Sequence, residues 1–305
     1  MNKFLLKYCP EKIHIFYSKV KLRTRFRINP KSLASELFEG LLGYKINWED
    51  PKDLNEKINW MKFNYDTTIW TDLADKYRVR KYVKERIGED VLTKLYGVWS
   101  NADQIDFDKL PPKFIFKTNQ GQGTVMPIPN KSELDINRTK KQLNDWVKLK
   151  YGYETIEPHY LKIRPLILAE QLLENDSKFS TSLVDYKVYC FSGKPYCILV
   201  CSDRTIGKKA HYSYYNCNWE PMPEVLKENL RNNFLYIPKP TCLNLLLDYA
   251  EKLAQGHPQV RVDFYIVNNK IYFGELTFTN SGGYDKDITR EASLAFGEKI
   301  NLSYK

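Results

Sequence analysis

Apolar residues along this chain of 305 residues follow two spacings, one typical of helices and one typical of strands. Helical spacing predicts helices over residues 31–70, 72–88, 142–151 and 243–253. Alternating or continuous apolar runs predict strands over residues 114–117, 166–173, 185–191, 196–201, 260–267 and 271–278. The last four strands form two hairpins, and no repeat or low-complexity tract interrupts the order.

The second hairpin carries the side chains with the clearest chemistry. Because side chains alternate along a strand, Arg261 and Asp263 share one face, and Glu275 and Thr277 share one face of the next strand. Adjacent carboxylates repel unless a cation lies between them. Carboxylates with a nearby arginine suit Mg²⁺ carrying nucleotide phosphates. The alternative is an exposed strand face with routine charges.

The loop of this hairpin decides whether the two carboxylates meet. A two-residue loop, Asn268-Asn269, would put Asp263 and Glu275 on opposite faces, whereas a loop that also includes Lys270 pairs them. The apolar neighbours of Asp263 require a core, so its carboxylate must face away from that core. We therefore predict the three-residue register.

A second candidate segment combines a strand-end lysine with a glycine-containing loop. Lys117 ends an apolar strand, and Gly121 and Gly123 follow between Gln120 and Thr124. Glycines let backbone N–H groups approach a phosphate, and a lysine adds a point charge. The segment is not a P-loop because no Gly-Lys-Ser/Thr follows. A plain glycine turn is the alternative.

Two further strands carry charges that need partners. Glu170 lies in an apolar strand, where a carboxylate is costly unless it is paired. A linker strand that meets an adenine edge would explain it, and so would a buried salt bridge to Arg164 or Lys162. Asp185 and Lys187 share a face that suits a ribose and a phosphate. The alternative for them is an ion pair across the sheet.

Composition narrows the class of protein. Apolar residues make up 43% of the chain, which excludes a disordered protein. The longest apolar runs are too short to cross a bilayer, and residues 1–9 lack the apolar core of a signal peptide. We therefore expect a cytoplasmic location. The six cysteines form no CxxC pair and do not cluster with histidines, which argues against a zinc site.

The net charge of +10 is concentrated at one end of the chain. Residues 1–30 hold eight basic residues against Glu11 alone, which gives +7 there. This basic arm predicts a tether to an anionic surface, either acidic lipid at the inner face of the membrane or acidic glycan. A solvated face is the alternative. No nucleic acid is expected as a partner because no recognised nucleic-acid motif accompanies the arm.

Taken in order, these segments resemble the ATP-grasp superfamily, and more narrowly the TupA-like ATP-grasp family of bacterial polysaccharide clusters. The resemblance covers about residues 50–298 and rests on four phrases, at 54–60, 74–80, 185–187 and 273–279. It implies an α+β fold whose two lobes, each with an antiparallel sheet, clasp ATP. It also implies a basic, helical N-terminal segment (1–70), a lobe with a glycine-rich lid (71–184) and a lobe with metal-binding strands (185–305).

The resemblance also assigns roles to residues. For ATP it implies Lys76, Lys117, Gln120, Gly121, Gly123, Thr124, Glu170, Gln171, Leu172, Leu173, Asp185 and Lys187. For Mg²⁺ it implies Asp263, Glu275 and Thr277 as ligands. For stabilising the transferring phosphoryl group it implies Arg261 and Lys117 as catalytic residues. Many members carry an asparagine where this chain has Thr277, a poorer ligand, and Asn280 lies three residues further on.

The implied activity is that of an ATP-dependent carboxylate–amine ligase that works through an acylphosphate. A uronic-acid carboxylate on a surface polysaccharide, or its precursor, is the implied acceptor, and an amino acid is a suitable amine. The loop after the metal strand supplies the candidate acceptor residues Ser281, Gly282, Tyr284, Lys286 and Arg290. The alternatives are a sugar or polysaccharide kinase and a glycosyltransferase-like protein.

Overall fold

The computed structural model describes the backbone of residues 11–204 and 210–304 and the side chains within them from residue 20 onward. Lys3 and Lys7 of the basic arm lie outside this part of the chain. The longer helices are α1 (Glu11–Ile28), α2 (Pro30–Leu42), α3 (Leu54–Asn64), α4 (Thr68–Ala74), α5 (Val79–Ile87), α6 (Ile136–Trp146), α8 (Leu243–Ala254) and α9 (Arg290–Glu298). None of the described helices is long and apolar enough to cross a membrane.

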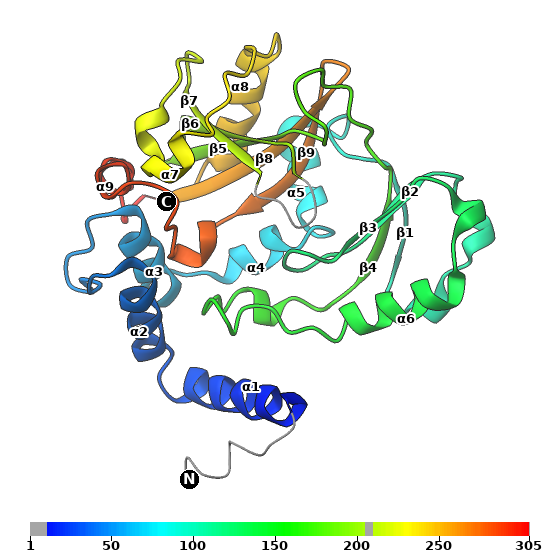
Figure 1. Ribbon diagram of the computed structural model, residues 1–305, viewed down its shortest axis with the longest axis horizontal. Helices are drawn as coiled ribbons and strands as arrows, with labels where there is room; N and C mark the ends of the chain where they lie inside the picture. Colours follow the sequence, from blue (N-terminus) through cyan, green and yellow to red (C-terminus); the bar gives the residue numbers. More distant parts are fainter. Residues whose placement is uncertain (1–10, 205–209, 305) are drawn as a thin grey trace.

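Two antiparallel sheets form the framework (Figure 1). The first has the order β1-β4-β2-β3, and the second has the order β7-β6-β5-β8-β9. The strands of the first sheet are β1 (Leu95–Trp99), β2 (Phe114–Thr118), β3 (Val125–Ile128) and β4 (Ile167–Glu170). Those of the second are β5 (Asp185–Phe191), β6 (Lys194–Ser202), β7 (His211–Asn216), β8 (Gln259–Val267) and β9 (Lys270–Thr277). The predicted α+β class with antiparallel sheets is confirmed.

The larger core lies on one face of the second sheet. Helix α8 packs against β5, β6 and β8, and α5 packs against α8. The buried side chains of α4 and α5, Trp70, Leu73, Val79 and Val83 among them, belong to this core. On the other face, Phe296 of α9 packs against Tyr189 and Tyr214. The rest of that face carries the polar residues of the candidate site.

The β8–β9 hairpin reaches the predicted pairing by a different route. Asp263 lies opposite Glu275, as predicted, but the loop is the two-residue turn Asn268-Asn269, because Val267 pairs with Lys270. A β-bulge at Gly274 supplies the extra residue, since Phe264 already pairs with Phe273. The predicted three-residue loop is therefore wrong, although the register that it was meant to explain is correct.

The helix predicted over residues 72–88 is broken in two. The Asp75 carboxylate accepts hydrogen bonds from the backbone N–H groups of Tyr77 and Arg78, at 2.8 and 3.2 Å. A carboxylate that caps N–H groups starts a new helix, so α5 begins after this turn. Helix α5 then ends before Gly88, as predicted. The next predicted helix, over 142–151, lies earlier, at Ile136–Trp146, because Asp135 caps it.

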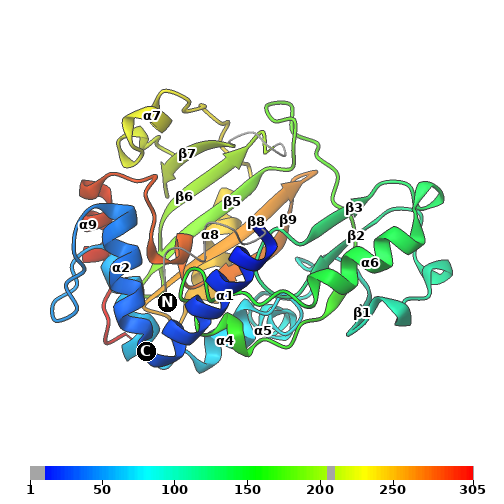
Figure 2. The same ribbon diagram turned by 60° about the horizontal axis from the view of Figure 1, so that its bottom comes forward.

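The N-terminal helices pack on the body of the protein (Figure 2). A separate apolar cluster joins Leu33 and Phe38 of α2 to Ile156 and Tyr284, and Leu22 and Phe26 of α1 pack against it. The basic arm is therefore partly anchored by apolar contacts from its own last turns. Arg25 of α1 forms an ion pair with Glu36 of α2, which neutralises one of its charges.

Candidate active site

Four charged side chains meet, largely buried, on the face of the second sheet opposite α8. Arg261 donates two hydrogen bonds to Asp263, both of 2.7 Å, and Lys187 on the neighbouring strand contacts the same carboxylate at 2.5 Å. Burial would lower the pKa of Lys187, but Asp263 raises it above the usual range. Asp185 lies 3.5 Å from Lys187. The alternative of an ion pair across the sheet is thus present for Lys187, whose partner is the predicted metal ligand Asp263 on the neighbouring strand.

Glu275 connects this cluster to the rest of the site. Its carboxylate lies 3.3 Å from the Lys76 ammonium and 3.7 Å from Arg261. Burial raises the pKa of Glu275, but Lys76, Lys187 and Arg261 outweigh it and lower the pKa to about 2. Lys76 also donates to the carbonyl oxygen of Gly121 at 2.6 Å. One ammonium group therefore contacts β9 and the glycine-containing loop.

Glu170 lies in a second charge cluster, on the first sheet. It lies 2.7 Å from Lys117 and 3.5 Å from Arg80, and it accepts a 2.7 Å hydrogen bond from Thr93. Burial would raise the pKa of Glu170, but Lys117 brings it below the ordinary value. A salt bridge was one expected explanation for this buried acid, but neither Arg164 nor Lys162 is the partner. Lys117 is held in place by the same contact.

The glycine-containing loop has the backbone conformation that requires its glycines. Gly121 and Gly123 have φ of +61° and +78°, a region that other residues rarely adopt. Gln120 is buried and donates to the carbonyl oxygen of Leu149 at 3.0 Å. The hydroxyls of Thr124 and Thr118 lie 2.6 Å apart and close the base of the loop. The loop is thus fixed at its base, and its exposed tip is Gln122-Gly123.

The predicted adenine linker leaves its strand earlier than expected. Strand β4 ends at Glu170, and Leu172 and Leu173 lie outside any strand and are half-buried. The Gln171 N–H donates to the carbonyl oxygen of Lys94 at 2.8 Å. Backbone groups after that bond are not part of the sheet.

The loop after β9 holds the five predicted acceptor residues in different surroundings. Ser281 and Lys286 are exposed, whereas Gly282 is buried behind them. Tyr284 is buried in the cluster formed with α2, and Arg290 pairs with Asp53 and contacts Tyr44. The structure therefore leaves Ser281 and Lys286 exposed, packs Tyr284 against α2, and ties the partly exposed Arg290 to Tyr44 and Asp53 in the connection between α2 and α3.

Sequence reasoning missed several side chains of the site. Arg204 forms a 2.6 Å ion pair with Asp185, and Arg80 supports Glu170. Burial raises the pKa of Tyr160 well above 10, and the nearby acids Glu157 and Glu275 raise it further. Arg80 belongs to one of the four phrases and could have been found there. Neither Arg204 nor Tyr160 has a signal in the sequence.

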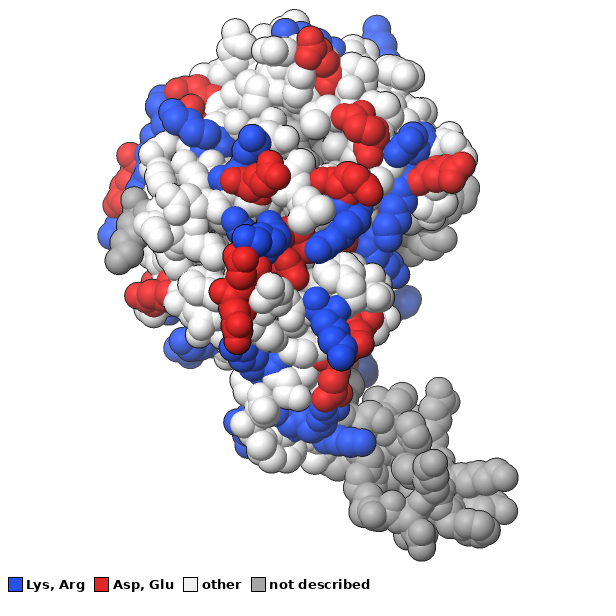
Figure 3. All heavy atoms as spheres, turned by 90° about the vertical axis from the view of Figure 1, so that its left-hand side faces the viewer, with Lys and Arg blue, Asp and Glu red and all other residues white. Residues whose placement is uncertain are grey.

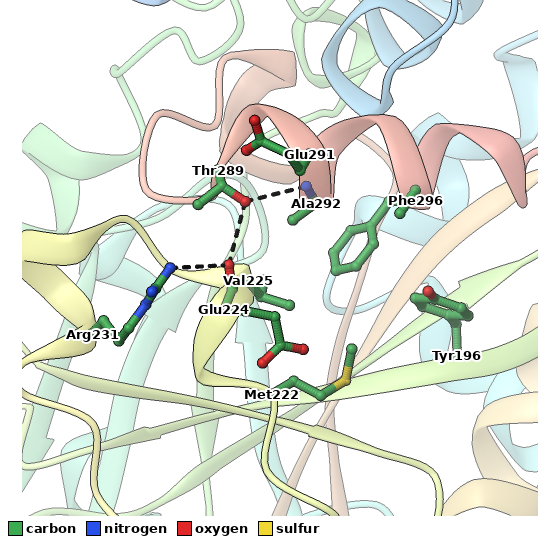
Figure 4. A pocket seen from close by; sticks show the side chains of 10 residues that line it. Tyr196, Met222, Glu224, Val225, Arg231, Thr289, Glu291, Ala292 and Phe296 are labelled. Carbon is green, nitrogen blue, oxygen red and sulfur yellow. Dashed lines mark hydrogen bonds between the residues drawn. The ribbon is translucent and has the colours of Figure 1, made fainter.

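A cavity of about 450 Å³ lies elsewhere, between β6, α9 and the segment 222–225 (Figure 4). Its floor is apolar, with Phe296 and Met222 among the lining residues. Its polar groups bind one another, because Arg231 and Thr289 donate to backbone oxygens of the 223–226 segment. None of the predicted site residues lines this cavity.

The carboxylates fit a divalent cation in their chemistry. Asp263 and Glu275 offer hard oxygen ligands from directly opposed positions, and the Glu275 side chain is 34% exposed with only long contacts to its cations. Asp263 is 4% exposed and fully paired, so it would have to share its oxygens with Arg261. The Thr277 hydroxyl lies 3.1 Å from the Arg261 guanidinium and 3.4 Å from the Glu275 carboxylate.

A glycine loop on one antiparallel sheet that meets paired carboxylates on another is the arrangement of the ATP-grasp class. More narrowly, this chain belongs to the TupA-like ATP-grasp family, which it matches over residues 56–301. The resemblance inferred from the four phrases is thereby confirmed. No curated protein sequence matches the chain.

Solved structures of similar fold have low sequence identity to this chain. D-alanine–D-alanine ligase from Bacillus anthracis is 13% identical with a TM-score of 0.40, and the match covers 74% of this chain and 60% of that one. The Helicobacter pylori enzyme is 12% identical with a TM-score of 0.45, covering 83% and 68%. L-amino acid ligase from Bacillus licheniformis is 10% identical with a TM-score of 0.47, covering 83% and 55%. The chain thus spans about 60% of the length of the first of these proteins.

Proposed function

We propose that the protein is an ATP-dependent carboxylate–amine ligase. The observation that carries this proposal is the position of Lys76, whose ammonium contacts both the glycine loop at Gly121 and the carboxylate of Glu275. A phosphate chain lying between these two elements would meet Lys76 together with Lys117 and Arg261. Membership of the TupA-like ATP-grasp family supports the same conclusion.

The residues suggest how the reaction would proceed. When bound, Mg²⁺ would neutralise charge on the phosphates, held by Glu275 and Asp263. The substrate carboxylate attacks the γ-phosphorus, the bond to the bridging oxygen of ADP breaks, and an acylphosphate forms. An amine then attacks the acyl carbon, loses a proton and displaces phosphate. Arg261 and the lysines stabilise charge, and the site needs no protein nucleophile.

The acceptor that we propose is a uronic-acid carboxylate of a bacterial surface polysaccharide or its precursor, and the amine is an amino acid. Lys286 is exposed on the loop after β9 and would attract an anionic glycan. We place the reaction in the cytoplasm, where ATP is available, with the basic arm holding the protein to an anionic surface.

The test is ADP release from Mg-ATP with a panel of uronic acids crossed with amino acids. We expect ADP release over many turnovers only when both are present, because the carboxylate alone can give no more than the single turnover that forms the acylphosphate, and we expect the loss of this activity in Asp263→Ala and Glu275→Ala. Asp248→Ala, on the outer surface of α8, is the control that should keep activity. ADP with a phosphoester and no need for an amine would identify a kinase instead. ADP release that requires no carboxylate would refute ligation.

A further inference from the structure

Residues 149–157, here called the bridging segment, contact the glycine loop on one side. Gln120 donates to the carbonyl oxygen of Leu149 at 3.0 Å, and the Tyr151 hydroxyl donates to the carbonyl oxygen of Gln122. The Tyr151 ring covers Gly121 so closely that a Cβ there would come within 2.3 Å of it. The tip of the glycine loop is therefore held by this segment.

The same segment contacts the loop after the metal strand. One carboxylate oxygen of Glu157 accepts a hydrogen bond from Thr279, and the other accepts one from Thr155. Lys62 of α3 donates to the carbonyl oxygen of Thr155 at 3.1 Å and to that of Gly282. Glu157 thus joins the bridging segment directly to Thr279, just beyond the end of β9, and Lys62 forms a second link between this segment and the same loop.

The bridging segment is built to hold a fixed shape. Gly152 has φ of +96°, and its carbonyl oxygen accepts a 2.7 Å hydrogen bond from the Glu157 N–H. Ile156 has φ of +53°, which is strained for a β-branched residue, and its side chain is only 1% exposed. A strained backbone conformation of this kind persists only where packing around it holds it in place, and such conformations are common at functional sites. Here the surroundings are Phe38 and Tyr284.

We propose that Glu157 is a positioning residue that couples the two loops. Nucleotide bound at the glycine loop strengthens the contact of that loop with Tyr151, and the bridging segment, which keeps its shape, transmits this through Glu157 to Thr279 and the loop that follows it. The acceptor loop is ordered in this way when ATP is in place, so the acylphosphate would form beside an assembled acceptor site. This coupling rests on the proposed function in taking Mg-ATP as the ligand of the glycine loop.

The experiment is amide hydrogen exchange of the full chain with and without the Mg²⁺ complex of the non-hydrolysable analogue AMP-PNP. In the wild type we expect slower exchange in peptides covering residues 118–126 and also in those covering 279–285. In Glu157→Ala the first effect should remain, and the second should fall by about fivefold, the equivalent of one hydrogen bond. Glu157→Gln, which can still accept from Thr279, should restore part of it.

The matched control is Glu154→Ala, because Glu154 is exposed on the same segment and, among the described residues, has no hydrogen bond or ion pair. It should behave like the wild type. If Glu157→Ala fails to fold, Thr279→Val removes the same contact from the other side. No slowing at 118–126 in the wild type would refute the nucleotide site. Slowing there, with the 279–285 peptides unresponsive or equally slowed in Glu157→Ala, would overturn the coupling alone.

Discussion

Single charged residues of the candidate site are held by partners of opposite sign within the protein. Lys117 pairs with Glu170, Lys187 with Asp263 and Lys76 with Glu275. Each acid fixes its cation where a phosphate would be needed, so the binding of ATP does not have to order free lysine side chains.

The Glu170 contacts predict a measurable loss of stability. Replacing Glu170 with Gln removes the charge that Lys117 and Arg80 share in a buried position, and the free energy of unfolding should fall by about 1–3 kcal/mol. Urea unfolding is the measurement. Glu174→Gln is the control: its 68% exposed side chain pairs with Lys113, so no change is expected. Equal effects of the two substitutions would contradict this account.

Most charged residues of the site could be named from the sequence, but their partners could not. Glu170 could be predicted to pair with a cation because it interrupts an apolar run. The two bases nearest in the sequence, Arg164 and Lys162, are nevertheless not its partners. Lys117 and Arg80 come from segments that only the folded sheet brings to Glu170. A charge in an apolar run shows that a partner exists, and the tertiary fold alone shows which one.

At the scale of elements, the β-bulge of the β8–β9 hairpin is visible in the spacing of the apolar residues along β9 and just after it. Ile271 and Phe273 are buried at odd positions, whereas Leu276 and Phe278 are buried at even ones. A change of phase within one strand means one extra residue, and Gly274 is the residue there that a bulge tolerates. The register could be predicted from the carboxylates, and the bulge could have been predicted from this shift of phase.

The glycine loop gives a prediction of its own. Gly121→Ala adds a Cβ that would clash with Tyr151, whereas nothing lies within 4 Å of a Cβ at Gly123, although both residues have positive φ. Gly121→Ala should therefore weaken Mg-ATP binding by roughly tenfold more than Gly123→Ala, as measured by calorimetric titration. Similar losses in the two variants would show that Tyr151 does not hold the loop.

At the scale of the whole molecule, the excess of positive charge comes mainly from the basic arm and not from the rest of the protein. On the face shown in Figure 3, basic and acidic side chains are interspersed. The arm also makes contacts of its own with the body, because Leu22 and Phe26 pack against it and Arg23 lies over the Tyr153 ring. We propose that anchoring to the body and tethering to an anionic surface are separate functions of the arm.

Two truncations would separate these functions. Removing residues 1–19 should weaken sedimentation with vesicles that contain acidic lipid, with little change in the melting temperature. Removing residues 1–30 should also lower the melting temperature, since it uncovers the cluster around Phe38 and Ile156. Vesicle binding that is unaffected by either truncation would refute the tether.

The contacts of α3 determine when this helix can complete its packing during synthesis of the chain. The buried amides of Asn55 and Asn59 bind the backbone of Asp285 and Gly283, and Lys57 binds that of Gly297, across 224 to 240 residues of chain. At ordinary rates of translation these partners leave the ribosome on the order of ten to fifty seconds after α3 does. Throughout that interval Asn55, Lys57 and Asn59 lack these C-terminal partners. The site is therefore among the last parts of the nascent chain to assemble.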